Sequence, residues 1–238
     1  PDPLAPVKTY DDASDREVVA LIASSLAVGR VELILKAIDQ VLKPLGEHPA
    51  AALKILGKSD LEKIYADFVY RFFKKKEIAG FLFAIGQALR KFGGLESLFL
   101  SGYKKDSLLD GIEKFCSFMD EESEHNCGIL ITPPEKGSAC KRFNLFLRWM
   151  VRCDSVDPGG WKCIDKRDLL VPVDTHMFDI ATRLGFTHRR YGDLKAALEI
   201  TAGFARYCPE DPVKFDFSLT RLGIHPDLDK SIFDKLTV

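Results

Sequence analysis

The sequence lacks the long apolar runs and the signal-like start that mark membrane and secreted proteins. No stretch of its 238 residues approaches the roughly 18 consecutive apolar residues of a membrane-spanning helix, so we expect no membrane partner. Residues 1–6 lack the basic and apolar regions of a secretory signal. Both absences favour a location in the cytoplasm.

Cysteine is present, but not in a pattern that forms a disulfide framework or holds a metal. The six cysteines include no C-x-x-C pair, and no four of them lie close enough in sequence for an iron–sulfur cluster. The spacing of His125, Cys127 and Cys140 matches no regular zinc motif. We therefore expect reduced thiols, no metal and no cofactor.

Net charge is also nearly absent, at −1, so the overall charge gives no support for a nucleic-acid partner. The charges are unevenly distributed, however. Residues 136–190 contain 11 Lys and Arg against 6 Asp and Glu, and the acidic run 120–124 precedes them. Such segregation can present one basic face to phosphates, although many soluble proteins show a similar local imbalance.

What the sequence does have is helical periodicity. In residues 76–92, apolar side chains recur at intervals of three and four residues: Ile78, Phe81, Leu82, Ile85, Leu89 and Phe92. Gly93 and Gly94 then end this helix. Ser59–Glu62 reads as a capping box at the start of an earlier helix, and Asp211-Pro212 suits the start of a late one.

The same reading predicts an all-α fold. We expect helices near residues 15–28, 30–43, 50–56, 60–70, 76–92, 94–102, 106–119, 138–152, 175–185, 192–207 and 212–222, with a short one at the end of the chain. Ile129–Thr132 is the one plausible extended run, and residues 120–136 and 154–172 look like loops.

Aromatic and basic residues follow one another between positions 68 and 76. The aromatic residues are interpreted as core residues in preference to base-stacking residues: Phe68, Tyr70, Phe72 and Phe73. Lys74–Lys76 reads as a solvated loop in preference to a DNA contact.

The predicted helix 138–152 carries one narrow polar stripe on an otherwise apolar surface, formed by Lys141, Asn144, Arg148 and Arg152. Lys141 lies in the first turn, where the helix dipole disfavours an ammonium group and is expected to lower the side-chain pKa. A nucleophilic lysine needs such help because its ordinary pKa is about 10.4. The alternative is a surface lysine without a catalytic role.

Asp174 occupies the N-cap position of the predicted helix 175–185. A carboxylate at that position accepts backbone N–H groups, which keep it ionised. Most such aspartates are purely structural caps. Neither Asp174 nor Lys141 therefore indicates catalysis when it is considered alone.

Considered together, the two segments resemble a known family. G-S-A-C-K-R-F-N (137–144) resembles the hairpin of the helix-hairpin-helix DNA glycosylases, in which a glycine-containing turn leads to the catalytic lysine. V-D-T-H-M-F (173–178) is similar to a segment of the endonuclease III branch whose aspartate is catalytic. Here Ala139 replaces the usual second glycine, and 33 residues separate Lys141 from Asp174. This long spacer is similar to that of the archaeal 8-oxoguanine glycosylases. The whole chain resembles a bacterial family of unknown function that is allied to them.

The resemblance implies a base-excision repair enzyme with DNA glycosylase and AP-lyase activity, removing an oxidised purine such as 8-oxoguanine. Lys141 would form a Schiff base with the sugar, and Asp174 would assist it. Asp216 would hold the extruded base. DNA contacts are expected from Gly137, Ser138, Ala139, Cys140, Arg142 and Arg148.

The resemblance also implies an architecture and a partner. We expect a single unit over residues 1–238 with a DNA-binding cleft and a degenerate helix-hairpin-helix. Its two helical subdomains would be residues 30–152, and residues 1–29 with 153–238. The partner would be double-stranded DNA with a damaged base, bound by a monomer in the bacterial cytosol or nucleoid. The alternatives are a non-enzymatic helix-hairpin-helix DNA-binding protein, in which Lys141 only contacts phosphate, and a helical protein-interaction module.

Overall fold

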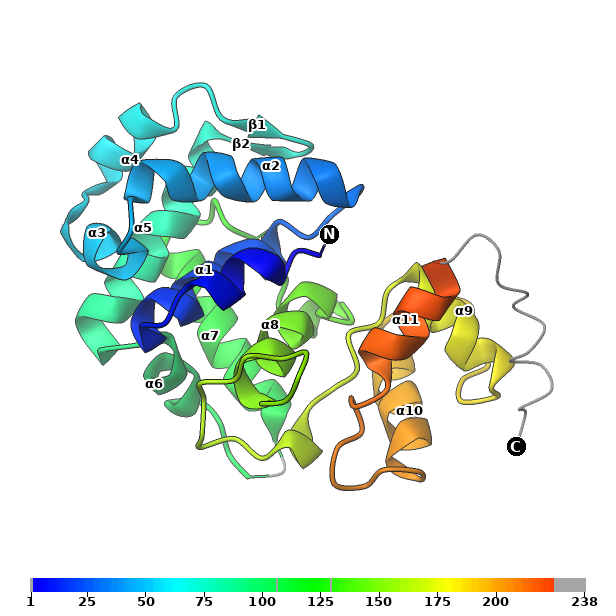
Figure 1. Ribbon diagram of the computed structural model, residues 1–238. Helices are drawn as coiled ribbons and strands as arrows, with labels where there is room; N and C mark the ends of the chain where they lie inside the picture. The colour runs from blue at the N-terminus through cyan, green and yellow to red at the C-terminus, as the bar shows by residue number, and fades with distance from the viewer. Residues whose placement is uncertain (1, 106, 129, 225–238) are drawn as a thin grey trace.

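The computed structural model describes residues 2–105, 107–128 and 130–224, and helices dominate it (Figure 1). The α-helices are α1 (Ala13–Ser25), α2 (Val31–Leu42), α3 (Pro49–Ile55), α4 (Lys58–Ile64), α5 (Lys75–Phe92), α6 (Leu95–Leu100), α7 (Leu108–Glu122), α8 (Lys141–Val151), α9 (Thr175–Arg183), α10 (Leu194–Ala205) and α11 (Asp216–Ile224). Short 3-10 helices cover Ala5–Thr9, Lys43–Leu45, Pro134–Lys136 and Lys166–Asp168. The predicted helical class is confirmed. Within these ranges, every helix falls short of what crossing a bilayer requires in length and apolar character.

Figure 1 shows two groups of helices joined by the segment 152–174. The larger group contains α1 to α8, and the smaller group contains α9, α10 and α11. In the larger group, α1 packs against α8, α2 and α3. Residues 1–29 are predicted to join the C-terminal helices, whereas α1 lies in the larger group of helices.

The core of the larger group forms where α5 lies against α3, α4 and α7. Gly86 allows α5 to approach α3 closely, because a Cβ atom there would lie 2.3 Å from the carbonyl oxygen of Leu53 in α3. A connected set of buried rings joins α6, α7 and α8 to the following loop: Phe99, Phe115, Phe143, Phe146 and Trp161. The first turn of α8 is therefore packed into the core through Phe143.

The largest difference from the sequence prediction lies in residues 65–74. The expected helix 60–70 ends at Ile64, and a two-stranded antiparallel hairpin follows it: β1 (Val69–Tyr70) and β2 (Phe73–Lys74). Side-chain contacts hold this segment, because the Tyr70 hydroxyl donates to the carbonyl of Val28 (2.6 Å) and Phe73 is buried. Phe68 and Tyr70 are also buried, as predicted, but Phe72 is exposed, so its assignment to the core is wrong.

Other boundaries differ for identifiable reasons. Helix α11 begins at Asp216 instead of residue 212, because Asp211 binds Arg152 instead of capping a helix. Helix α4 starts at Lys58, where Asp60 accepts the N–H of Gly57 (3.1 Å), so the predicted Ser59–Glu62 capping box is wrong. In the expected extended run, residues 130 and 131 are turn and bend, and residue 132 has no regular secondary structure. The helix expected at the end of the chain lies outside the described residues. The predicted end of α5 is confirmed, since Gly93 adopts the left-handed conformation.

Candidate active site

Lys141 and Asp174, which are remote in sequence, meet in the structure. The Nζ atom of Lys141 lies 3.4 Å from Oδ2 of Asp174, and the two side chains are 37% and 19% exposed. Lys141 is the first residue of α8, and Asp174 is the N-cap of α9. The pair thus joins the start of one helix in the larger group to the start of one in the smaller group.

A tight turn places Lys141. Gly137 (φ 72°) follows the 3-10 helix Pro134–Lys136, and Cys140 adopts a left-handed conformation (φ 48°) just before α8. The side-chain amide of Asn144 in α8 (Nδ2) donates to the carbonyl of Ala139 (2.9 Å) and so ties the turn to the helix. In the described part of the chain, the Asn144 Oδ1 atom is buried without a hydrogen-bond partner.

A buried extended segment places Asp174. Residues 169–173 are buried, and the N–H of Val171 donates to the Thr201 hydroxyl in α10 (3.0 Å). Asp174 Oδ1 then accepts the N–H of Met177 (2.8 Å). The carboxylate is therefore fixed by the helix that it caps, while its second oxygen faces Lys141.

Backbone groups of the turn at 137–140 form hydrogen bonds within the chain. The N–H of Gly137 donates to Pro134 (2.8 Å), and that of Cys140 donates to the Ser138 hydroxyl (3.1 Å). The N–H of Leu194 donates to the carbonyl of Gly137 (3.0 Å). The structure thus gives no support to a phosphate grip by the amides of Gly137 and Cys140.

Arg142 points back into the larger group. Its guanidinium donates to the carbonyl of Ser25 at the end of α1 (3.1 Å) and lies over the ring of Phe73 in β2 (5.7 Å). Burial lowers the pKa of Arg142. The side chain thus connects the start of α8 to both α1 and the hairpin.

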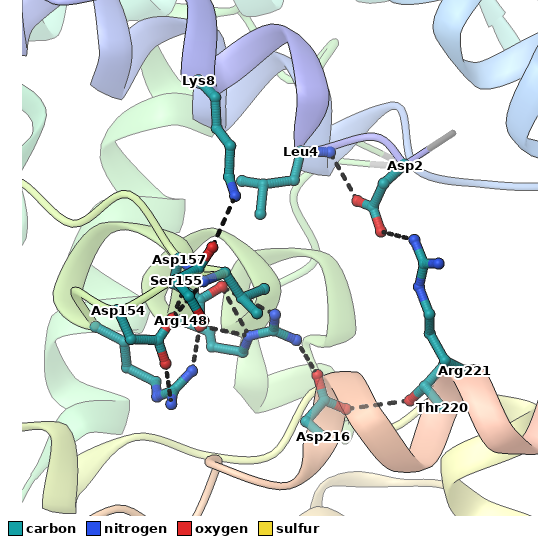
Figure 2. A network of polar contacts seen from close by, with 12 residues as sticks. Asp2, Leu4, Lys8, Arg148, Asp154, Ser155, Asp157, Asp216, Thr220 and Arg221 are labelled. Carbon is teal, nitrogen blue, oxygen red and sulfur yellow. Dashed lines mark hydrogen bonds and ion pairs between the residues drawn. The ribbon is translucent and has the colours of Figure 1, made fainter.

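Arg148 and Asp216 belong to a buried ionic network, shown in Figure 2. The Arg148 guanidinium is 3% exposed, donates to Asp157 (Nη2–Oδ1 2.9 Å) and contacts Asp216 in α11. Arg152 binds the same Asp157 and also Asp211 (3.1 Å). Arg148 is therefore unable to reach a DNA phosphate in this conformation, and the contact expected of it is corrected to a structural role.

The position of Asp216 also differs from the expected base contact. One of its oxygens contacts Arg148, and the other accepts the hydroxyl of Thr220 (3.4 Å). Burial raises the pKa of Asp216, Arg148 opposes that shift, and the nearby charge of Asp174 adds to it. Burial alone would lower the pKa of Arg148, but Asp216 and Asp157 raise it above its ordinary value. Asp216 begins α11, the helix that packs against α9, so the charge of Asp174 at the start of α9 acts on Asp216.

An open depression of about 720 Å³ lies in the loop between α9 and α10. It is lined by Phe186, Thr187, His188, Arg189, Arg190, Tyr191, Asp193 and Glu199. Asp193 forms a β-bridge with Ser138, so this loop adjoins the turn that leads to Lys141. Arg189 is paired with Asp193 (2.7 Å), whereas Arg190 and Tyr191 are exposed.

Sequence reasoning missed the buried partners of the polar stripe. Asp157 lies in the D-P-G-G loop and Asp211 precedes α11, and both are buried against arginines. One signal was available in the sequence: Arg148 and Arg152 lie one turn apart, in and directly after the largely apolar helix α8. If such a helix is buried, its arginines need buried carboxylates as partners. Within the described ranges, no three His, Cys, Asp or Glu side chains gather as a metal site would require.

Comparison with known proteins corrects the family assignment. No curated protein and no solved structure matches the chain. A family model described as "Protein of unknown function (DUF2400)" matches residues 2–225. The assignment to the helix-hairpin-helix DNA glycosylases and their archaeal branch is therefore wrong. It depended on two short segments, and a glycine turn before a helix and an aspartate N-cap are common structural devices. The chain belongs to the DUF2400 family of proteins of unknown function.

Proposed function

We propose that this protein is a DNA glycosylase with AP-lyase activity, in which Lys141 forms a Schiff base with the sugar of a damaged nucleotide. The observation that carries the proposal is the 3.4 Å approach of Lys141 Nζ to Asp174 Oδ2, with both side chains partly exposed. An amine nucleophile beside a positioned carboxylate is the arrangement that covalent catalysis by lysine requires.

The chemistry proceeds in two steps. The neutral amine of Lys141 bonds to C1′ of the sugar, and the bond from C1′ to the base breaks, leaving its electron pair on the base. Asp174 accepts a proton from the lysine nitrogen and stabilises positive charge on the sugar. The first step ends when the lone pair of the attached nitrogen breaks the C1′–O4′ bond, and O4′ takes the proton held by Asp174, which opens the sugar ring and gives the iminium ion. In the second step, loss of a C2′ proton to water breaks the C3′–O3′ bond, so that the 3′ phosphate leaves and the strand is nicked.

The proposed substrate is duplex DNA with an oxidised purine, of which 8-oxoguanine is the first candidate. A base within the stack keeps its C1′ away from a protein amine, so the nucleotide must be extruded. We place the DNA-binding cleft between the two helical groups, because Lys141 and Asp174 come from opposite groups. Exposed Arg190, beside the turn at 137–140, supplies charge for the phosphates.

The geometry favours this proposal over a protein that only binds DNA. A lysine that serves solely as a phosphate contact gains nothing from a fixed carboxylate beside it. The charge of Asp174 would repel the phosphate and compete for the ammonium group. A catalytic lysine, in contrast, needs a group that takes its proton.

Borohydride trapping with oligonucleotides tests the proposal. We expect a covalent adduct between the wild-type protein and DNA containing an oxidised purine, and no adduct with Lys141→Gln. Lys136→Gln is the matched control, because Lys136 is exposed and directly precedes the turn at 137–140; it should retain the adduct. Absence of an adduct across a broad panel of lesions, or an adduct that persists in Lys141→Gln, contradicts the proposal.

A further inference from the structure

The tip of the β1–β2 hairpin exposes a phenylalanine. Tyr70 pairs with Phe73, so Arg71 and Phe72 form a two-residue turn. Phe72 is 65% exposed, although a large apolar side chain in water is unfavourable. Arg71 has a φ of 53°, a conformation that non-glycine residues rarely adopt. The hairpin tip thus combines an exposed ring with a backbone conformation that a non-glycine residue rarely adopts.

The residues on either side of this tip are firmly anchored. Tyr70 donates its hydroxyl to Val28, and Phe73 is 1% exposed beneath the guanidinium of Arg142. Arg142 directly follows Lys141 on α8. The hairpin, at the top of the larger group in Figure 1, is therefore tied to the start of α8, where the proposed nucleophile lies.

The surroundings of Phe72 are basic. The Arg71 guanidinium lies 5.7 Å from the centre of the Phe72 ring, and its Nη1 atom lies against Gly29. Lys74 and Lys76 are exposed on the same segment. An aromatic ring between cations matches the chemistry of nucleic acids, which offer base faces for stacking and phosphates for pairing.

We propose that Phe72 inserts into the base stack of duplex DNA, at the position vacated by the nucleotide that Lys141 engages. Arg71, Lys74 and Lys76 then contact the flanking phosphates. This inference deepens the proposed function and rests on it for the identity of the extruded nucleotide. Inserting the ring keeps the neighbouring bases stacked while the damaged nucleotide is outside the helix.

The first test measures binding alone, with full-length protein and no chemistry. The probes are two duplexes, one intact and one with a tetrahydrofuran abasic analogue, which leaves a gap in the stack. Wild type should prefer the abasic duplex. Phe72→Ala should lose ~10- to 100-fold in affinity for it, with little change for the intact duplex, and Phe72→Trp should retain the preference. Lys74→Gln should weaken both duplexes alike.

The second test separates this inference from the proposed function. Phe72→Ala should form the Lys141 adduct slowly on a paired lesion and at the wild-type rate on a lesion in a bulge, where no base pair has to open. Equal rates for wild type and Phe72→Ala on both substrates overturn the role of Phe72 and leave the proposed function standing. If the protein prefers the abasic duplex in a way that depends on Phe72 but forms no adduct, the role of Phe72 stands and the proposed function is overturned.

Two controls complete the design. Phe72 is exposed, so Phe72→Ala should melt at the temperature of wild type. Arg71→Gly relieves the strained φ and should preserve the hairpin while removing one cation. If wild type binds neither duplex at low salt, the hairpin is not a DNA contact, and an exposed ring that captures a protein partner becomes the alternative.

Discussion

The two carboxylate oxygens of Asp174 have different partners: Oδ1 accepts the N–H of Met177 (2.8 Å), and Oδ2 lies 3.4 Å from Nζ of Lys141. The residue thus caps α9 and faces the proposed nucleophile at the same time. Its structural role and its proposed chemical role depend on different atoms, so substitutions can separate them.

Asp174→Asn should preserve the cap and remove the charge, because asparagine is as good an N-cap as aspartate. We expect melting close to wild type and a loss of roughly 100-fold or more in the single-turnover rate of adduct formation. Asp174→Ala should show the same loss of rate and a further ~1 kcal/mol loss of stability. A wild-type rate in Asp174→Asn would show that the carboxylate is only a cap.

Arg148→Met should destabilise the protein strongly. The change leaves Asp216 buried without a cation and Asp157 with Arg152 alone, and breaking a buried ion pair in this way costs about 3–5 kcal/mol. Urea denaturation followed by circular dichroism measures the effect. The control is Arg189→Met, which also removes ion pairs but near the surface, and its effect should be far smaller. Equal effects in the two variants contradict the structural role assigned to Arg148.

His48 should make stability depend on pH. Its Nδ1 atom lies 3.0 Å from Oδ2 of buried Asp15, and this hydrogen bond raises the pKa of His48. Since the folded pKa is above the unfolded value of about 6.5, the contribution is fully present below that value. It is lost as the pH rises through the folded pKa. NMR titration should place the His48 pKa above 6.5.

The variant His48→Gln checks the same linkage. The melting temperature of His48→Gln should decrease less between pH 6 and pH 8 than that of the wild type. An identical slope in the two proteins would contradict the linkage.

Gly86→Ala should destabilise the protein even though alanine favours helices. Alanine gains about 1 kcal/mol in helix propensity, but its Cβ atom would lie 2.3 Å from the Leu53 carbonyl oxygen, so α3 and α5 must separate. Overpacking of this kind costs about 1–3 kcal/mol. Gly80→Ala is the graded comparison, because its Cβ atom would lie 3.1 Å from the nearest atom. A higher melting temperature in Gly86→Ala would contradict the close contact.

The sequence predicts the helices well because each buries one face, so its apolar residues recur at the helical period. The same logic places Lys141 and Asp174 at the starts of α8 and α9, where a glycine turn and an N-cap mark the boundaries. Their 3.4 Å approach depends on how the two helical groups pack, which local patterns do not encode.

The hairpin and the ionic network escape sequence reasoning for different reasons. Strands β1 and β2 have two residues each, and Arg71-Phe72 lacks the asparagine or glycine that marks a tight hairpin turn. The sequence around Arg148 and Arg152 does not mark them as buried. Their carboxylate partners come from two loops and from α11. Arginine is usually exposed, so only the folded chain reveals these partners.

The shared cation in the interior also constrains how related chains can diverge. Arg148 contacts two buried carboxylates, Asp157 and Asp216, and Asp157 also contacts Arg152, so losing Arg148 leaves Asp216 buried without a cation. Substitutions at these positions should therefore accumulate together. Homologues that replace Arg148 by an apolar residue should have a neutral side chain at position 216, which an alignment of the family would show as correlated columns.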